Sequence, residues 1–68
     1  MRYDVARLAA DMAMKGWNNS ALAAKARVSS MTVGRFLSGE VQTAKTAAKL
    51  AKALGHEVSR YLPEAVAS

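Results

Sequence analysis

The segment LAAKARVSSMTVGRFLSG, residues 22–39, constrains the fold of this chain more than any other part of the sequence. Its alanine-rich first part favours one short helix, and the apolar residues that recur at helical spacing in its second part favour another. Only residues 27–29 lie between the two, so the helices must meet at a tight corner. Such a corner needs a small residue where the helices cross, and Ala23 meets that need. Two short helices joined in this way form a helix-turn-helix.

Further helices are expected on both sides of this corner, and no segment shows the alternating pattern of a β-strand. Asp4, Asn18 and Ser29 are suited to cap helix N-termini, and the glycines are suited to follow helix C-termini. The expected helices cover residues 5–15, 19–26, 30–38, 43–54 and 57–62, with a tail over residues 63–68. The residues expected in the core include Val5, Leu8, Ala9, Met12, Trp17 and Phe36. The sequence thus predicts a single all-α domain.

Composition narrows the classes of function. The chain has 68 residues, no cysteine and one histidine, so we expect neither a disulfide nor a metal site. No apolar run approaches the roughly 18 residues of a membrane span, and the first residues lack the apolar stretch of a signal peptide. No carboxylate pair, nucleophile–base pair or phosphate loop suggests an enzyme. We therefore expect a soluble, cytoplasmic, non-enzymatic protein with no cofactor and no small-molecule ligand.

The balance of charge points to a class of partner. Ten lysines and arginines against five acidic residues give a net charge of +5. On a domain this small, such an excess attracts polyanions, of which DNA and RNA are the first candidates. The lysines at 45, 49 and 52 fall on the outer side of the fourth expected helix, and we interpret them as a solvated face.

The corner segment resembles the helix-turn-helix of the lambda-repressor/Cro-like family of bacterial and phage regulators. The resemblance extends to TAAKLAKALGHEVSRYL, residues 46–62, which is similar to the last two helices of that domain. It implies a five-helix DNA-binding domain over roughly residues 18–62. The family usually has glycine where this chain has Arg27, glutamine or glutamate at Ala21, and a polar residue at Leu37. Arg27 is therefore expected at a positive φ, which L-residues rarely adopt.

The resemblance also implies which residues meet DNA. In this family the third helix enters the major groove, and residues near its start contact base edges. The base-reading residues carried over in this way are Ser30, Met31, Thr32 and Arg35. The residues expected to contact phosphates are Asn19, Lys25, Arg27, Ser29, Gln42 and Thr43. Arg35 is the foremost candidate, because its planar guanidinium matches the O6 and N7 atoms of guanine.

The leading hypothesis is a sequence-specific transcriptional regulator that binds a palindromic operator in double-stranded DNA as a homodimer, like a Cro-type or minimal repressor. The residues expected at the dimer contact are Val58, Tyr61, Leu62 and Val66. One alternative is a protein-interaction module, such as an antitoxin whose helical surface masks a toxin. Another is a nonspecific nucleoid or RNA binder. Selection from random DNA sequences would separate the first hypothesis from these two.

Overall fold

Short polar side chains begin each of the four α-helices. Asp4, Asn18, Ser29 and Thr43 each accept a hydrogen bond from the backbone N–H three residues later, which satisfies a donor that the helix itself leaves free. The helices are α1 (Val5–Met14), α2 (Asn19–Ala26), α3 (Ser30–Ser38) and α4 (Ala44–Ala53). The caps at Asp4, Asn18 and Ser29 confirm the sequence prediction.

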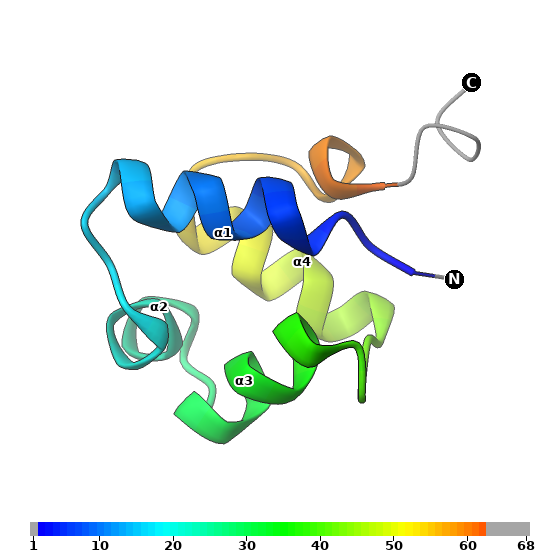
Figure 1. Cartoon of the computed structure of the whole chain (residues 1–68), viewed down its shortest axis with the longest axis horizontal. Coiled ribbons are helices and arrows are strands. Elements are labelled where there is room, and N and C mark those ends of the chain that lie inside the picture. The colour runs from blue at the N-terminus through cyan, green and yellow to red at the C-terminus, as the bar shows by residue number, and fades with distance from the viewer. Residues whose placement is uncertain (1, 63–68) are drawn as a thin grey trace.

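The computed structural model describes residues 2–62 (Figure 1). Within this range there is no strand, so the all-α prediction is confirmed. The fifth expected helix is a correction, because Val58–Tyr61 forms a single 3-10 turn, η1, and not an α-helix. The first and fourth helices are also shorter than expected, since Lys15 and Leu54 are their C-caps and Thr43 is an N-cap. The predicted tail over residues 63–68 lies outside the described residues.

The four α-helices end beside residues in the left-handed backbone conformation. Three of these residues are glycines, Gly16, Gly39 and Gly55, with φ between 69° and 82°. The fourth is Arg27, at φ 60°. The expected positive φ at the corner is therefore confirmed, and Arg27 is the one such residue in the described chain that is not glycine.

Helix α4 lies behind the other helices in Figure 1 and supplies a large part of the core. Its residues Ala47, Leu50, Ala51 and Leu54 are all at most 3% exposed. Helix α1 crosses above, while α2 and α3 lie below it (Figure 1). The core is completed by Leu8, Met12, Leu22, Ala23, Ala26, Val33, Phe36 and Tyr61.

Of the residues expected in the core, Ala9 lies outside it, and Val5 and Trp17 are only partly buried against its edge. Ala9 is exposed, because α1 turns the face that carries Leu8, Asp11 and Met12 toward the interior. Trp17 is only half-buried, and the ammonium groups of two lysines approach its ring. The distances to the ring centroid are 5.4 Å for the Nζ atom of Lys15 and 5.9 Å for that of Lys25. Its indole therefore lies against the edge of the core, which Tyr61 and Phe36 fill instead.

A polar cluster ties α1 to η1, and we call its three members, Asp11, Arg60 and Tyr61, the Asp11 clasp. The Asp11 carboxylate accepts hydrogen bonds from Arg60 Nε at 2.7 Å, from Arg60 Nη2 at 2.9 Å and from the Tyr61 hydroxyl at 2.6 Å. The Arg60 hydrogen bonds hold the pKa of Asp11 well below its ordinary value, although burial acts in the opposite direction. Burial, helped by the hydrogen bond to Asp11, raises the pKa of Tyr61.

Among residues 2–62, no helix has both the length and the apolar character needed to cross a membrane.

Candidate nucleic-acid interface

The corner between α2 and α3 is closed by packing and by backbone hydrogen bonds. Leu22 is fully buried and Ala23 is 3% exposed. The N–H of Val28 donates to the carbonyl of Ala23 at 3.0 Å, which turns the chain back against α2. Ala23 is thus the small residue at the crossing, as the sequence predicts. The corner fixes the direction in which α3 leaves the core.

Helix α3 has one buried and one exposed face. Val33 and Phe36 are at most 1% exposed and anchor the helix to the core. On the other side, Met31 is 62% exposed, and Ser30 and Arg35 are exposed as well. In the described part of the chain, the Arg35 guanidinium takes part in no hydrogen bond or salt bridge. The structure therefore brings Ser30, Met31 and Arg35 together on one open helix face.

Thr32 differs from the other candidates on α3. Its side chain is half-buried, and its hydroxyl lies 2.8 Å from the hydroxyl of Ser29. The Ser29 oxygen also accepts a hydrogen bond from the Thr32 N–H at 3.1 Å. These two side chains hold the first turn of α3, which limits what either offers to another molecule.

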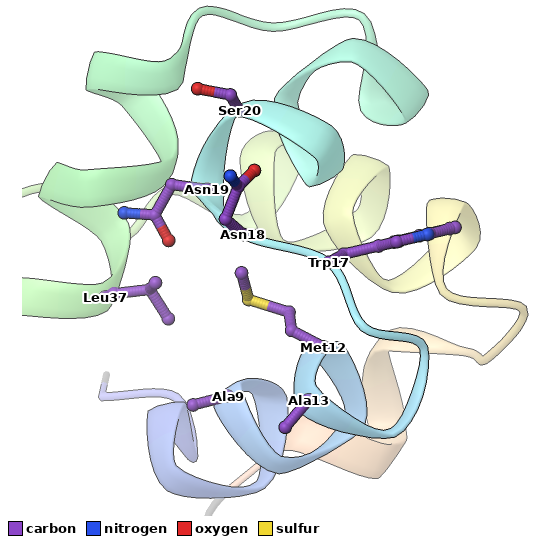
Figure 2. A pocket seen from close by; sticks show the side chains of 8 residues that line it. All are labelled: Ala9, Met12, Ala13, Trp17, Asn18, Asn19, Ser20 and Leu37. Atoms are coloured by element: carbon purple, nitrogen blue, oxygen red, sulfur yellow. The ribbon is translucent and has the colours of Figure 1, made fainter.

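The start of α2 lies beside α3 and α1 (Figure 2). The Asn18 side chain caps the helix by accepting from the N–H of Ala21 at 2.9 Å. The N–H groups of Asn19 and Ser20 lack an acceptor among residues 2–62, as expected for the first turn of a helix. Figure 2 shows the Asn19 side chain directed toward α3. Free N–H groups at a helix start form a site that favours anions, because the helix dipole adds positive potential there.

A hollow of about 450 Å³ adjoins this helix start. Helix α1 contributes Met12 from one side and α3 contributes Leu37 from the other (Figure 2). Its complete lining is Ala9, Met12, Ala13, Trp17, Asn18, Asn19, Ser20 and Leu37. The hollow therefore has an apolar side and a polar rim at the α2 start.

Gln42, one of the expected phosphate contacts, forms two hydrogen bonds within the chain. Its Oε1 accepts from the Tyr3 N–H at 3.0 Å, and its Nε2 donates to the carbonyl of Phe36 at 2.9 Å. The amide therefore binds the chain leading into α1 to the end of α3, and both of its ends are occupied. Thr43 is exposed, but its hydroxyl caps α4 by accepting from the N–H of Thr46 at 3.2 Å.

The remaining phosphate candidates lie at the end of α2. Lys25 and Arg27 are both exposed, and together with α4 they border a second hollow. Among the expected dimer residues, Tyr61 is a correction, because its ring is 2% exposed and its hydroxyl binds Asp11 in the same chain. Val58 and Leu62 are half-buried, and Val66 lies outside the described residues.

The Asp11 clasp was not predicted from the sequence. A signal for it existed, since Asp11 stands three residues after Leu8 and one before Met12, within the apolar stripe of α1. A carboxylate in such a stripe needs a hydrogen-bonding partner. No residue near Asp11 in the sequence indicates that this partner is Arg60.

Residues 8–59 match the family model described as helix-turn-helix. The chain belongs to the lambda-repressor/Cro-like helix-turn-helix family. This is a family of DNA-binding regulators, typically without enzymatic activity. Comparisons with curated proteins and with solved structures found no match.

Proposed function

We propose that this helix-turn-helix protein is a sequence-specific transcriptional repressor of the Cro or minimal type, which binds a palindromic operator as a homodimer. Family membership supports DNA binding. The observation that carries the finer proposal is the open face of α3, where Arg35 and Met31 project from a helix that Val33 and Phe36 anchor. Acting on operator DNA, the protein would work in the cytoplasm of a bacterial cell or of a phage-infected host.

The residues of α3 would read the bases. Arg35 offers two parallel N–H donors to guanine O6 and N7, a pairing worth about 1–3 kcal/mol of discrimination. Met31 cannot form such bonds, but its exposed thioether can pack on a thymine methyl group. Ser30 can donate to or accept from several bases, so it would specify little. Thr32, held by Ser29, would contribute mainly by shaping the start of α3.

The start of α2 would bind the DNA backbone. The free N–H groups of Asn19 and Ser20, together with the Asn19 amide, suit a phosphate oxygen. Ser29 and Thr43 cap the starts of α3 and α4. The free backbone N–H groups at these two helix starts would bind phosphate oxygens as those of α2 do. Such contacts fix the register of the protein on DNA without reading sequence.

A dimer would place two such helices on successive turns of the duplex. Half-sites of one operator lie about 34 Å apart. The longest extent of one molecule is 31 Å, so one copy can occupy each half-site without overlapping the other. Val58 and Leu62, both half-buried, and Val66 form the proposed contact, from which Tyr61 is now removed. Sedimentation with operator DNA should show two copies per site, and one copy at saturation would exclude the dimer.

The deciding experiment selects binding sites from random duplex DNA and then measures variants on the selected operator. Arg35→Ala should weaken operator binding by about 1–3 kcal/mol and relax the preference at one base pair. Arg7→Gln is the control, because it also removes one arginine charge, but from α1 instead of α3. The Nη1 atom of Arg7 contacts the Arg60 carbonyl at 3.4 Å. Met31→Ala has its own control in Met14→Ala, because Met14 is an even more exposed methionine on α1.

Affinity should also fall steeply with salt, since about 6–10 neutralised phosphates per dimer release counterions. Selection that yields no preferred sequence would favour a nonspecific binder. A stoichiometric protein partner, with little affinity for DNA, would favour the interaction-module alternative.

A further inference from the structure

Four cations surround a hollow on a face that α3 does not line. The hollow has a volume of about 410 Å³ and lies between the end of α2 and helix α4. Lys25 and Arg27 border it on the α2 side, and Lys49 and Lys52 border it on the α4 side. Its remaining lining residues are Ala26 and Ala53. The turn that precedes α3 and the lysines of α4 thus form one surface, which we call the α2–α4 basic hollow.

No acidic residue neutralises this surface. The lining contains no carboxylate, and within residues 2–62 none of the four cations forms a salt bridge. Ala26 is 8% exposed and Ala53 is half-buried, so the hollow also has apolar walls. A concave site with charges of one sign and walls of low dielectric concentrates its field and attracts the opposite charge.

Helix stability does not account for the arrangement. Lys25 and Lys52 lie in the last turns of their helices, where a cation interacts favourably with the helix dipole. Lys49 lies farther inside α4, and Arg27 occupies a left-handed conformation that opposes any non-glycine residue. Strain that is retained in a fold is a reason to look for a function at that residue.

We propose that the α2–α4 basic hollow binds the phosphodiester backbone of duplex DNA, in addition to the contacts made by the starts of α2 and α3. A backbone carries a charge at every phosphate, so successive phosphates can neutralise the cations of both helices at once. Lys49 and Lys52 then belong to the DNA-binding surface and are more than a solvated face. The inference rests on the proposed DNA-binding function.

The test compares two double variants that remove the same charge. Lys49→Gln/Lys52→Gln changes the hollow, whereas Arg7→Gln/Lys15→Gln removes two exposed cations that do not line it. Glutamine keeps a high helix propensity, so both variants should fold, and circular dichroism checks this. Affinity is measured against salt concentration on the selected operator, with flanking duplex at both ends, and on random duplex of equal length.

The hollow variant should weaken binding equally on both duplexes and should reduce the salt slope by about two for each bound protomer, or about four for a dimer, while the control changes neither appreciably. DNA should also protect Lys49 and Lys52, but not Lys15, from acetylation. Equal effects of the two double variants, or no protection of Lys49 and Lys52, would overturn the inference. So would tighter binding of poly-glutamate than of DNA at the hollow, which would indicate an acidic protein partner. Arg35→Ala separates the two proposals. If this variant keeps the operator preference of the wild type, base reading by Arg35 is contradicted, but backbone binding by the hollow is not.

Discussion

Two arginines in this protein lie in opposite circumstances. Arg60 donates two hydrogen bonds to Asp11, a carboxylate that is 9% exposed and lies in the apolar face of α1. Arg27 is exposed, has no acidic partner among residues 2–62 and holds a φ of 60°. Arg60 therefore contributes to the stability of the fold, whereas Arg27 opposes it.

The difference separates structural charge from functional charge. The clasp satisfies each of its members, because Asp11 accepts three hydrogen bonds and the buried Tyr61 hydroxyl has a partner. The ends of the other three α-helices carry glycine in the left-handed conformation. At the corner between α2 and α3, Arg27 carries a side chain and a charge in that conformation. Strain that is retained where glycine would fit is a reason to look for an interaction of Arg27 outside the chain. Variants of each arginine region test this contrast.

The largest effect is expected from Asp11→Asn. The variant keeps the shape of the side chain but turns an amide toward Arg60 and weakens the hydrogen bond of the buried Tyr61 hydroxyl. Hydrogen bonds to charged groups contribute about 1.5–3 kcal/mol each, and part of this is screened because the Arg60 side chain is 41% exposed. We expect a loss of about 2–3 kcal/mol in the free energy of unfolding, or roughly 10–20 °C in Tm.

Glu40→Gln is the control for this change, since it neutralises an exposed carboxylate. Arg60→Gln should lower Tm less than Asp11→Asn, because the bond between Tyr61 and Asp11 remains. An Asp11→Asn variant with the Tm of the wild type would show that the clasp does not hold η1 against α1.

The pH dependence of stability should carry the signature of the clasp. The pKa of Asp11 is depressed below its ordinary 3.8, so its contribution is present above that pH and is lost as acid protonates the carboxylate. The pKa of Tyr61 is raised above its ordinary 10.0, so its contribution is present below pH 10 and is lost at higher pH. Thermal melts should show wild-type Tm falling more steeply than that of Asp11→Asn between about pH 5 and the acid limit. Parallel curves would contradict the assignment.

How far the sequence predicts this molecule depends on whether the signal is local. The N-caps and the corner are local, because each depends on a few neighbouring residues, whereas the positive φ at Arg27 is what the family resemblance implies; all are confirmed. The clasp joins residues 49 positions apart, and nothing near Asp11 indicates which of ten cations it meets. The hydrogen bond of Gln42 to Tyr3 was not expected for the same reason, since the two residues lie 39 positions apart.

The candidate site also has one part that local sequence signals predict and one part that they do not. The exposed face of α3 follows from the helical spacing of Val33 and Phe36, and the structure places Met31 and Arg35 on it. The approach of Lys25 and Arg27 to Lys49 and Lys52 depends on how α2 packs against α4, which periodicity alone does not specify. The contacts with DNA and with a second copy stay predictions.

Gly16→Ala measures the strain that a side chain suffers at a helix end of this kind. Gly16 has a φ of 69°, and a Cβ atom there would meet nothing within 4 Å, so the cost is purely conformational. A strain of about 1 kcal/mol, close to the penalty assigned to Arg27, is partly offset because alanine gives the unfolded chain less freedom, an effect of roughly 0.4–1 kcal/mol. We therefore expect a net loss of at most about 0.6 kcal/mol in the free energy of unfolding, which chemical denaturation of the two proteins measures. A variant clearly more stable than the wild type would mean that a side chain at this kind of helix end suffers little strain.

The smallest effect on stability is expected from Arg27→Gly. Glycine removes a clash of about 1 kcal/mol but gives the unfolded chain more freedom, an opposing effect of roughly 0.4–1 kcal/mol. The Tm should therefore stay the same or rise slightly. DNA binding should weaken about equally on operator and random duplex, with a shallower salt slope, because a phosphate contact carries no sequence information.

Arg27→Ala and Arg27→Lys separate charge from backbone at this corner. Alanine keeps the left-handed strain and removes the charge, so it should lose DNA affinity to the same extent as glycine without the gain in Tm. Lysine keeps both the strain and the charge, so it should bind DNA nearly as the wild type does. A clear fall in Tm for Arg27→Gly would show that the arginine stabilises the corner through its own contacts. If Tm holds and affinity for both duplexes is unchanged in all three variants, Arg27 has no role in DNA binding, and the contrast with Arg60 is one of exposure alone.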